Sequence, residues 1–258
     1  MSFEETIMSK IALITGGSRG LGRSMVLALA KKGVDSIFTY ASNEDAALAV
    51  VDEVKQLGSN AIVLQFEATD FTAYNEFAAR VKALLSDKFN DRPLDFLINN
   101  AGTGLHKSIA DTTMEDMDFL YQLHVKAPYF LTQSLLSEIA DNGHIVNLSS
   151  GLARFSVPGA SAYAMMKGAV EVMTRYMAKE LGERGISVNT LAPGAIATDF
   201  NGGAVRDNPQ MNQYVSSVTA KGRVGEAEDI GPLVASLLTS DANWMTGQRI
   251  EASGGMFL

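Results

Sequence analysis

Short apolar runs alternate with longer segments of helical periodicity along most of the chain. The runs have the length and the unbroken apolar character of strands that are buried on both faces. We expect strands at residues 11–14, 36–39, 61–64, 95–98, 144–148 and 186–191. We expect helices at residues 24–32, 44–57, 74–85, 117–139 and 164–181. This alternation predicts an α/β fold, in which helices cover both faces of a parallel sheet and ligands bind beyond the carboxyl ends of the strands.

The domain organisation follows from length and composition. A chain of 258 residues can form one large domain or two small ones. With 47% hydrophobic residues it can bury a substantial core, and neither an internal repeat nor a segment rich in Pro, Gly or Ser divides it. We therefore expect a single domain over residues 9–258, preceded by a short tail at residues 1–8.

Targeting signals and charge limit the classes of function. The acidic tail lacks the basic region of a secretory signal, and every apolar run is shorter than the ~20 residues that cross a bilayer, so we expect a cytoplasmic protein without membrane contact. The net charge of −8 excludes an overall basic field for nucleic acid. The chain has no cysteine and its three histidines lack the paired spacing of metal ligands, so no metal site is expected.

A glycine-rich turn, TGGSRGLG at residues 15–22, links the first expected strand to a helix. Gly16 can form the tight turn, Gly20 lets the backbone approach a pyrophosphate, and Gly22 allows the helix to pack close to the strand. The N–H groups of the helix N-terminus then face the phosphates. An ordinary loop is the alternative interpretation, which the strand–turn–helix context disfavours. The turn therefore predicts a dinucleotide cofactor.

The end of the second expected strand indicates which dinucleotide binds. An NAD site usually places an acid there, which bonds the ribose 2′-hydroxyl, whereas residues 39–43 carry no carboxylate. Arg19 can supply positive charge to a 2′-phosphate, and Ser42 and Asn43 can donate hydrogen bonds to it. We therefore favour NADP(H) over NAD(H). In the alternative interpretation Arg19 is a solvated loop residue, and Glu44 and Asp45 simply begin the next helix in either case.

The spacing of three polar residues predicts the chemistry. Ser150 ends the fifth expected strand, and Tyr163 and Lys167 follow it, four residues apart on one helix face. A phenol needs its pKa lowered by about three units, or roughly 4 kcal/mol, to act as a base at neutral pH, and Lys167 beside a cationic nicotinamide can provide much of this. Tyr163 would exchange a proton with the substrate oxygen, which Ser150 would hydrogen-bond, while the cofactor carries the hydride.

Several motifs in this order resemble the short-chain dehydrogenase/reductase family, over nearly the whole chain. They are the TGxxxGxG turn at 15–22, NNAG at 99–102, the trio Ser150, Tyr163 and Lys167, the PGxxxT segment at 193–198, and the C-terminal pattern that ends in Gly254 and Gly255. The overall pattern is most similar to the 3-oxoacyl-carrier-protein reductase branch. The resemblance implies a doubly wound Rossmann-type domain with a mostly parallel sheet of about seven strands, and a carbonyl or secondary alcohol as substrate.

The resemblance also implies the remaining cofactor contacts. Lys167 would bind the nicotinamide ribose beside Tyr163, and Ala68 would contact the adenine through its backbone. The other implied cofactor residues, from the pyrophosphate to the carboxamide end, are Gly16, Ser18, Arg19, Gly20, Leu21, Asn100, Gly102, Pro193, Gly194, Ile196 and Thr198. Many relatives are tetramers built through the long helices after the fourth and fifth strands, so a homo-oligomer, either a tetramer or a dimer, is expected.

Two residues depart from the family pattern. His124 stands where the family has a catalytic Asn, and Glu67 where it usually has an Asp. His124 is either a group that titrates near pH ~6.5 or a locally packed residue whose main chain serves the same purpose as that of the Asn. It is also the one feature that favours an alternative function, an NADP-binding sensor or scaffold with weakened catalysis.

Residues 199–221 interrupt the alternation of strands and helices. We interpret this segment as a mobile substrate lid. Its Phe200, Met211 and Tyr214 can form an apolar wall, although a plain surface excursion is the alternative.

Overall fold

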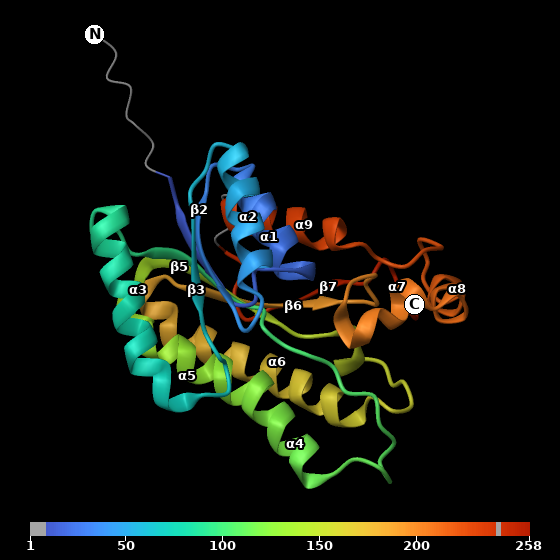
Figure 1. Ribbon diagram of the computed structural model, residues 1–258. Coiled ribbons are helices and arrows are strands. Elements are labelled where there is room, and N and C mark those ends of the chain that lie inside the picture. The colour runs from blue at the N-terminus through green and yellow to red at the C-terminus, as the bar shows by residue number, and fades with distance from the viewer. Residues whose placement is uncertain (1–8, 241–243) are drawn as a thin grey trace.

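The computed structural model describes residues 9–240 and 244–258, so the tail expected at residues 1–8 lies outside the described part (Figure 1). In this part, seven strands form one parallel sheet in the order β3-β2-β1-β4-β5-β6-β7. The strands are β1 Ile11–Ile14, β2 Asp35–Tyr40, β3 Ala61–Gln65, β4 Leu94–Asn99, β5 Ile139–Leu148, β6 Ser187–Pro193 and β7 Arg249–Ala252. The doubly wound α/β fold is thereby confirmed.

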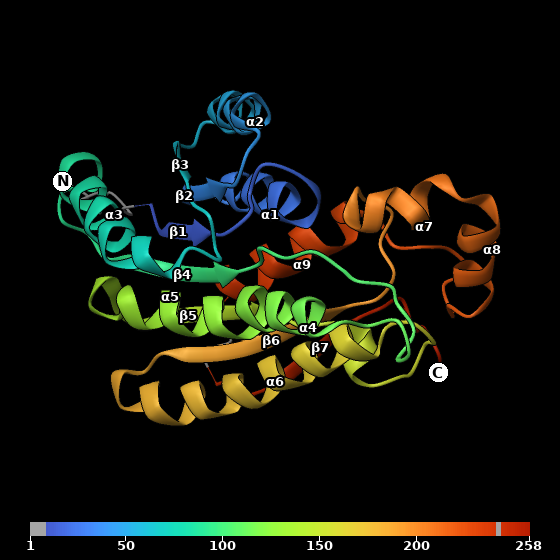
Figure 2. The ribbon, with the colours of Figure 1, turned by 60° about the horizontal axis from the view of Figure 1, so that its bottom comes forward.

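Helices cover both faces of the sheet (Figure 2). The helices outside residues 199–221 are α1 Gly20–Ala30, α2 Glu44–Gln56, α3 Tyr74–Phe89, α4 Met114–Tyr121, α5 Ala127–Ser134, α6 Ser161–Leu181 and α9 Ala227–Thr239. One apolar layer joins the sheet to α1, α2 and α9, and the other joins it to α3, α5 and α6. Neighbouring strand residues enter opposite layers, since Leu13 belongs to the second and Ile14 to the first, and both are fully buried. Two-sided burial explains why the strands are unbroken apolar runs.

The long helix expected at 117–139 is interrupted in the structure. A π-helical turn, Gln122–Lys126, separates α4 from α5, and β5 already begins at Ile139. Pro128 lies in the first turn of α5. Because proline has no N–H, it cannot donate to the His124 carbonyl four residues earlier, and the helical ladder widens there.

Residues 199–221 form an excursion beyond the carboxyl ends of the strands (Figure 2). The excursion contains the 3-10 turn Phe200–Gly203, α7 Ala204–Asp207 and α8 Pro209–Ser217. Asn201, Gly202 and Gly203 have positive φ angles of 52°, 67° and 77°, which sharply reverse the chain. That the excursion opens and closes as a lid stays a prediction. Within the described residues, no helix is both long and apolar enough to span a membrane.

The glycine turn generates a stability prediction. A Cβ at Gly22 would lie 2.0 Å from the Gly16 carbonyl oxygen, whereas at Gly168, among the described residues, no heavy atom would lie within 4 Å. We expect Gly22→Ala to lower the free energy of unfolding by at least about 2 kcal/mol, because backbone must move. The matched control Gly168→Ala should raise it by about 0.5–1 kcal/mol through helix propensity. Urea unfolding measures both, and equal effects would contradict the proposed packing.

Candidate active site

The glycine turn has the backbone shape of an anion cradle. Gly16 and Gly20 adopt the left-handed region, with φ of 69° and 53°. Among the described residues, no side chain caps the N-terminus of α1, and its first turn carries no acid. The N-terminus of α2 differs, because the Asn43 side chain accepts from Ala46 N and Glu44 lies in the first turn. The N–H groups at the start of α1 are thus available to an anionic ligand.

Asn100 holds the turn with its side chain. Its Nδ2 donates to the Thr15 carbonyl at 2.8 Å and to the Gly16 carbonyl at 3.2 Å. The Thr15 hydroxyl in turn accepts from the backbone N–H of Asn100 and of Ala101, each at 2.9 Å. Thr15 is a residue to which the sequence analysis gave no role of its own. The sequence pattern that could have indicated it is a hydroxyl residue at the point where an apolar strand ends.

The adenosine side of the expected cofactor site lies at the surface. Arg19 is exposed at the N-cap position of α1, and Ser42 is exposed just after β2. Ser18 and Leu21 are half-buried within the turn and the start of α1. Ala68 is buried, and its carbonyl accepts from the Tyr74 hydroxyl at 2.7 Å.

Glu67 and Asn43 each hydrogen-bond to residues two or three positions further along the chain. The Glu67 carboxylate accepts from the backbone N–H and the hydroxyl of Thr69, so it folds over its own loop. The Asn43 side-chain oxygen caps α2 by accepting from Ala46 N at 2.9 Å. Glu44 and Asp45 do begin that helix.

The segment after β6 closes over the turn. A Cβ at Gly20 would lie 3.7 Å from the Thr198 side chain, so these two expected cofactor residues face each other. Ile196 is held by a β-bridge to Gly225. Gly194 lies against Ser253, where a Cβ would come within 2.8 Å, and its N–H donates to the Ala252 carbonyl. Pro193 is the last, buried residue of β6. The structure therefore places this segment at the mouth of the cradle.

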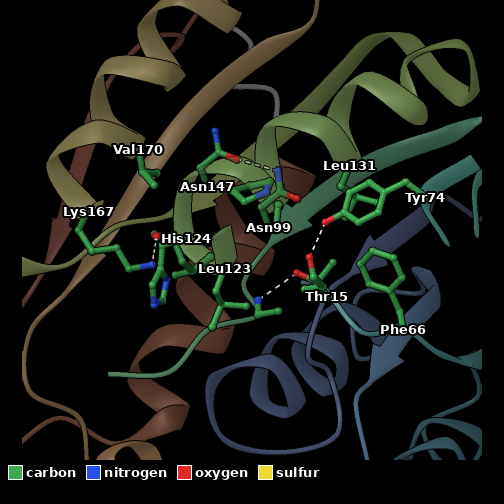
Figure 3. A pocket seen from close by; sticks show the side chains of 15 residues that line it. Thr15, Phe66, Tyr74, Asn99, Leu123, His124, Leu131, Asn147, Lys167 and Val170 are labelled. Carbon is green, nitrogen blue, oxygen red and sulfur yellow. Dashed lines mark hydrogen bonds between the residues drawn. The ribbon is translucent and has the colours of Figure 1, made fainter. Parts of the chain in front are cut away.

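Ser150, Tyr163 and Lys167 converge at the end of β5. Tyr163 and Lys167 are buried one turn apart on α6, at 8% and 5% exposure. Ser150 follows β5, its oxygen accepts from Leu152 N at 3.2 Å, and its hydroxyl lies near enough to Tyr163 to influence the pKa of the phenol. The Lys167 ammonium donates to the Leu148 carbonyl at 2.8 Å (Figure 3). A strand end and one helix face thus bring all three side chains together.

Burial dominates the electrostatics of this trio. It lowers the pKa of Lys167 to about 7 and raises the pKa of Tyr163 above its ordinary value, a rise that the nearby Ser150 hydroxyl opposes. We expected Lys167, beside a cationic nicotinamide, to lower the pKa of Tyr163; this stays a prediction for the protein with its cofactor. The Lys167 ammonium is bonded to the Leu148 carbonyl and lies 5.5 Å from the centre of the Tyr163 ring. Tyr163 is therefore a protonated phenol at neutral pH.

His124 is packed, not pH-sensitive. Its ring is 2% exposed, Nε2 lies 2.7 Å from the Thr103 carbonyl oxygen, and the ring meets that of Tyr163 edge to face at 5.2 Å. Burial, followed by the charge of Lys167, lowers the pKa of His124 to about 2. A Cβ at Gly102 would touch this ring at 2.7 Å. His124 stays neutral at physiological pH, so the hypothesis of a group titrating near 6.5 is wrong.

A small cavity lies beside Lys167, with Lys167 and His124 at one end and Tyr74 at the other (Figure 3). Its volume of ≈ 20 Å³ has room for about one water molecule. Thr15 and Asn147 also line it, so polar partners are available. Among the described residues, no cluster of three or more His, Cys, Asp or Glu side chains could hold a metal ion.

The excursion at 199–221 reaches the site through Phe200. The centres of the Phe200 and Tyr163 rings lie 6.0 Å apart. A Cβ at Gly104 would lie 2.1 Å from the Asn201 side chain, so the loop after β4 packs directly against the excursion. Met211 and Tyr214 of α8 are exposed, at 40% and 51%. Of the three residues expected to form an apolar wall, Phe200 is the one that the structure brings to Tyr163.

Comparisons with known proteins agree with this geometry. A family model described as Enoyl-(Acyl carrier protein) reductase matches residues 16–257. The short-chain dehydrogenase/reductase FrzI of Cladobotryum sp is 34% identical over 258 residues, which cover 97% of each chain.

Two solved structures are also similar. The promiscuous reductase LugOII, which catalyses keto-reduction at C1 during lugdunomycin biosynthesis, has a TM-score of 0.91 and 39% identity, covering 97% of this chain and 99% of its own. The landomycin C-6 ketoreductase LanV, solved with NADP and rabelomycin, has a TM-score of 0.87 and 33% identity, covering 96% of each chain. Because a family model matches residues 16–257 and relatives of 34% and 39% identity cover 97% of it, the chain belongs to the short-chain dehydrogenase/reductase family.

Proposed function

We propose that the protein is an NADPH-dependent ketoreductase, which reduces a ketone to a secondary alcohol and can catalyse the reverse oxidation. The observation that carries this proposal is the convergence of the Ser150, Tyr163 and Lys167 side chains at the carboxyl end of the sheet, beside the glycine turn. The names of LugOII and LanV, both reductases of keto groups, support the same chemistry.

The residues present fit a dinucleotide. The left-handed glycines and the uncapped N-terminus of α1 suit a pyrophosphate. Gly16, Ser18, Gly20 and Leu21 would hold this part, and Thr198, which faces Gly20, would hold the carboxamide end with its neighbours Pro193, Gly194 and Ile196. When bound, the nicotinamide supplies the hydride. Asn100 shapes the turn, and Gly102 and Ala68 contribute backbone surface.

A 2′-phosphate is the preferred form of the adenosine end. Arg19 is exposed beside the turn, and residues 40–43 present no carboxylate that would repel the phosphate. Ser42 is exposed at the same strand end and can donate a hydrogen bond. The LanV structure with bound NADP supports this choice.

The side chains of the trio divide the work of ketone reduction. The Ser150 oxygen already accepts from Leu152 N, which leaves its hydrogen free to donate to the ketone oxygen. As hydride adds to the carbonyl carbon, negative charge grows on that oxygen, and the protonated Tyr163 gives it the Oη proton. When the cofactor is bound, Lys167 would hold the nicotinamide ribose, and its ammonium, 5.5 Å from the centre of the Tyr163 ring, would place positive charge near the phenolate that remains. His124 fixes the Tyr163 ring from its edge.

The substrate side and the assembly complete the proposal. The 199–221 excursion acts as the lid of the single catalytic domain, and Phe200 presents an aromatic face to a ketone held at Tyr163.

The protein forms a dimer or tetramer through α4, α5 and α6, whose outer face exposes Tyr121, Tyr129 and Val172. Burying such an apolar face between copies would remove it from water.

Removing the Tyr163 hydroxyl tests the mechanism. Tyr163→Phe should lower kcat by about 10²–10⁴-fold, because the proton donor is lost while the ring stays in place. NADPH oxidation is measured against a panel of ketones that includes 3-oxoacyl thioesters and polycyclic aromatic ketones, with Tyr176→Phe on the exposed face of the same helix as the control. Full activity of Tyr163→Phe would refute the mechanism. Binding of NADPH without reduction of any ketone would favour the sensor or scaffold instead.

Arg19 provides the test of cofactor choice. Arg19→Ala should raise the KM for NADPH by about tenfold or more and leave the KM for NADH nearly unchanged, because a charge-assisted bond to the 2′-phosphate is lost. The control is Lys32→Ala, which removes an exposed cation just after the same helix. Parallel changes for both cofactors would contradict the assignment of Arg19.

The burial of His124 predicts the pH dependence of a variant. Since the pKa of His124 is held at about 2, the ring is neutral on both sides of pH 6.5. His124→Asn should therefore leave the inflection points of the kcat/KM profile between pH 5 and 8 where the wild-type protein has them, even if kcat falls through looser packing of Tyr163. Loss of an inflection near pH 6.5 in the variant would show that His124 titrates after all.

A further inference from the structure

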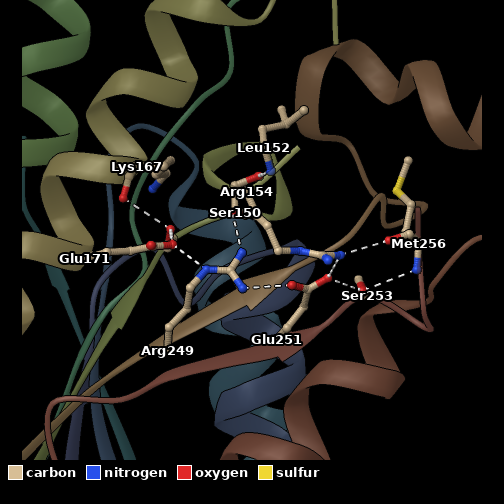
Figure 4. Close-up of polar contacts among 10 residues, drawn as sticks. Ser150, Leu152, Arg154, Lys167, Glu171, Arg249, Glu251, Ser253 and Met256 are labelled. Atoms are coloured by element: carbon tan, nitrogen blue, oxygen red, sulfur yellow. Dashed lines mark hydrogen bonds and ion pairs between the residues drawn. The ribbon is translucent and has the colours of Figure 1, made fainter. Parts of the chain in front are cut away.

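A network of charged side chains lies next to Ser150 (Figure 4). It consists of Glu171 on α6, Arg249 and Glu251 on β7, and Arg154 in the loop after Ser150. The side chains of the first three are only 16%, 23% and 22% exposed. Ion pairs that are this well covered are costly to break on one side, because the partner is left as an uncompensated charge.

Arg249 is the centre of this network. Its Nε donates to Glu171 at 2.7 Å, its Nη1 to Glu251 at 2.7 Å, and its Nη2 to the Ser150 carbonyl at 3.3 Å (Figure 4). Three different nitrogens of one planar group therefore reach three different elements. A lysine could not reproduce this fork, because its donors radiate from a single nitrogen.

The two glutamates connect Arg249 to the surroundings. Glu171 also accepts from the Ser149 hydroxyl at 2.7 Å, and it lies one turn after Lys167 on the helix that carries Tyr163. Glu251 also accepts from Arg154 at 2.7 Å. The network thus ties the end of β5 to the helix of the trio and to the C-terminal strand.

Ser150 depends on such contacts for its orientation. It lies beyond Leu148, where β5 ends. Its carbonyl accepts from Ala153 N at 3.1 Å as well as from Arg249, and its hydroxyl oxygen accepts from Leu152 N. The direction of the hydroxyl hydrogen toward a ketone is therefore set by how the main chain at Ser150 is held.

We propose that Arg249 is a positioning residue: its guanidinium, clamped between Glu171 and Glu251, fixes the Ser150 carbonyl and thereby the direction of the Ser150 hydroxyl. The catalytic consequence rests on the role proposed above for Ser150. Without the clamp, the carbonyl loses one of its donors, Glu171 loses its cation and Glu251 keeps only Arg154, so the 150–153 loop relaxes. A small displacement of a group that must meet the substrate oxygen has a large effect on rate.

The experiment compares Arg249→Met with Arg184→Met. Arg184 is a matched arginine. It lies at the start of β5, the end opposite to Ser150, where it donates to the Asp141 carboxylate and to the carbonyls of Leu136 and Ile139. It touches no member of the trio in these contacts. Both variants lose an arginine that donates to carboxylate and main-chain carbonyl oxygens at an end of β5, so a purely structural effect should appear in both.

Two readouts are measured well below the melting temperature of each variant. One is kcat together with the Kd for NADPH, and the other is hydrogen exchange of the Leu152 and Ala153 amides, which bond to Ser150. For Arg249→Met we expect kcat to fall by about 10- to 100-fold at unchanged Kd, and these amides to exchange at least about tenfold faster. Arg184→Met should leave both unchanged.

Other outcomes would overturn the inference. Wild-type kcat and amide protection in Arg249→Met would show that the clamp does not hold Ser150, and equal losses in Arg184→Met would show a general loss of stability. The two proposals fail separately. If the wild-type protein reduces no ketone, the proposed function fails, while amide exchange at Leu152 and Ala153 still decides whether Arg249 positions Ser150.

Discussion

The close contact of Gly22 with the Gly16 carbonyl is the constraint on which the cofactor side of the molecule depends. A side chain at this point would collide with backbone at 2.0 Å, so α1 can start against the end of β1 only if the residue is glycine. Asn100 and Thr15 then join this turn to the end of β4. The cradle is therefore built almost wholly from backbone groups, which explains how an acidic protein with a net charge of −8 can receive an anionic ligand.

Burial sets the protonation states of the side chains around Tyr163. It raises the pKa of Tyr163, lowers that of Lys167 to about 7 and keeps His124 neutral. All three shifts have desolvation as their main cause, so they follow from the packing of α6 and the π-helical turn against the strand ends. A protonated phenol suits the reducing direction, in which the substrate oxygen must gain a proton.

The sequence predicted the parts of the structure that depend on local pattern. Strands that are buried on both faces can be recognised in the sequence as apolar runs. Tyr163 and Lys167, four residues apart, share one face of their helix whatever its position in the fold. The pKa of His124 could not be foreseen, because it depends on the residues that enclose the ring, such as Gly102 and Thr103. The break before α5 has a local cause, Pro128, which is visible in the sequence and could have predicted an interruption of the helix expected at 117–139. The contact of Arg249 with Ser150 joins residues 99 positions apart, and no local pattern marks it.

The charge balance of the network explains how it can support the site without disturbing it. Arg154 and Arg249 carry two positive charges, and Glu171 and Glu251 carry two negative ones, so the network is neutral as a whole. A lone arginine behind Ser150 would add a field that favours the phenolate of Tyr163 and disfavours the ammonium of Lys167. With each guanidinium paired, the arginines contribute directed hydrogen bonds and rigidity, while the pKa of Lys167 is lowered by burial. Position and proton affinity at this site are thus controlled by different parts of the structure.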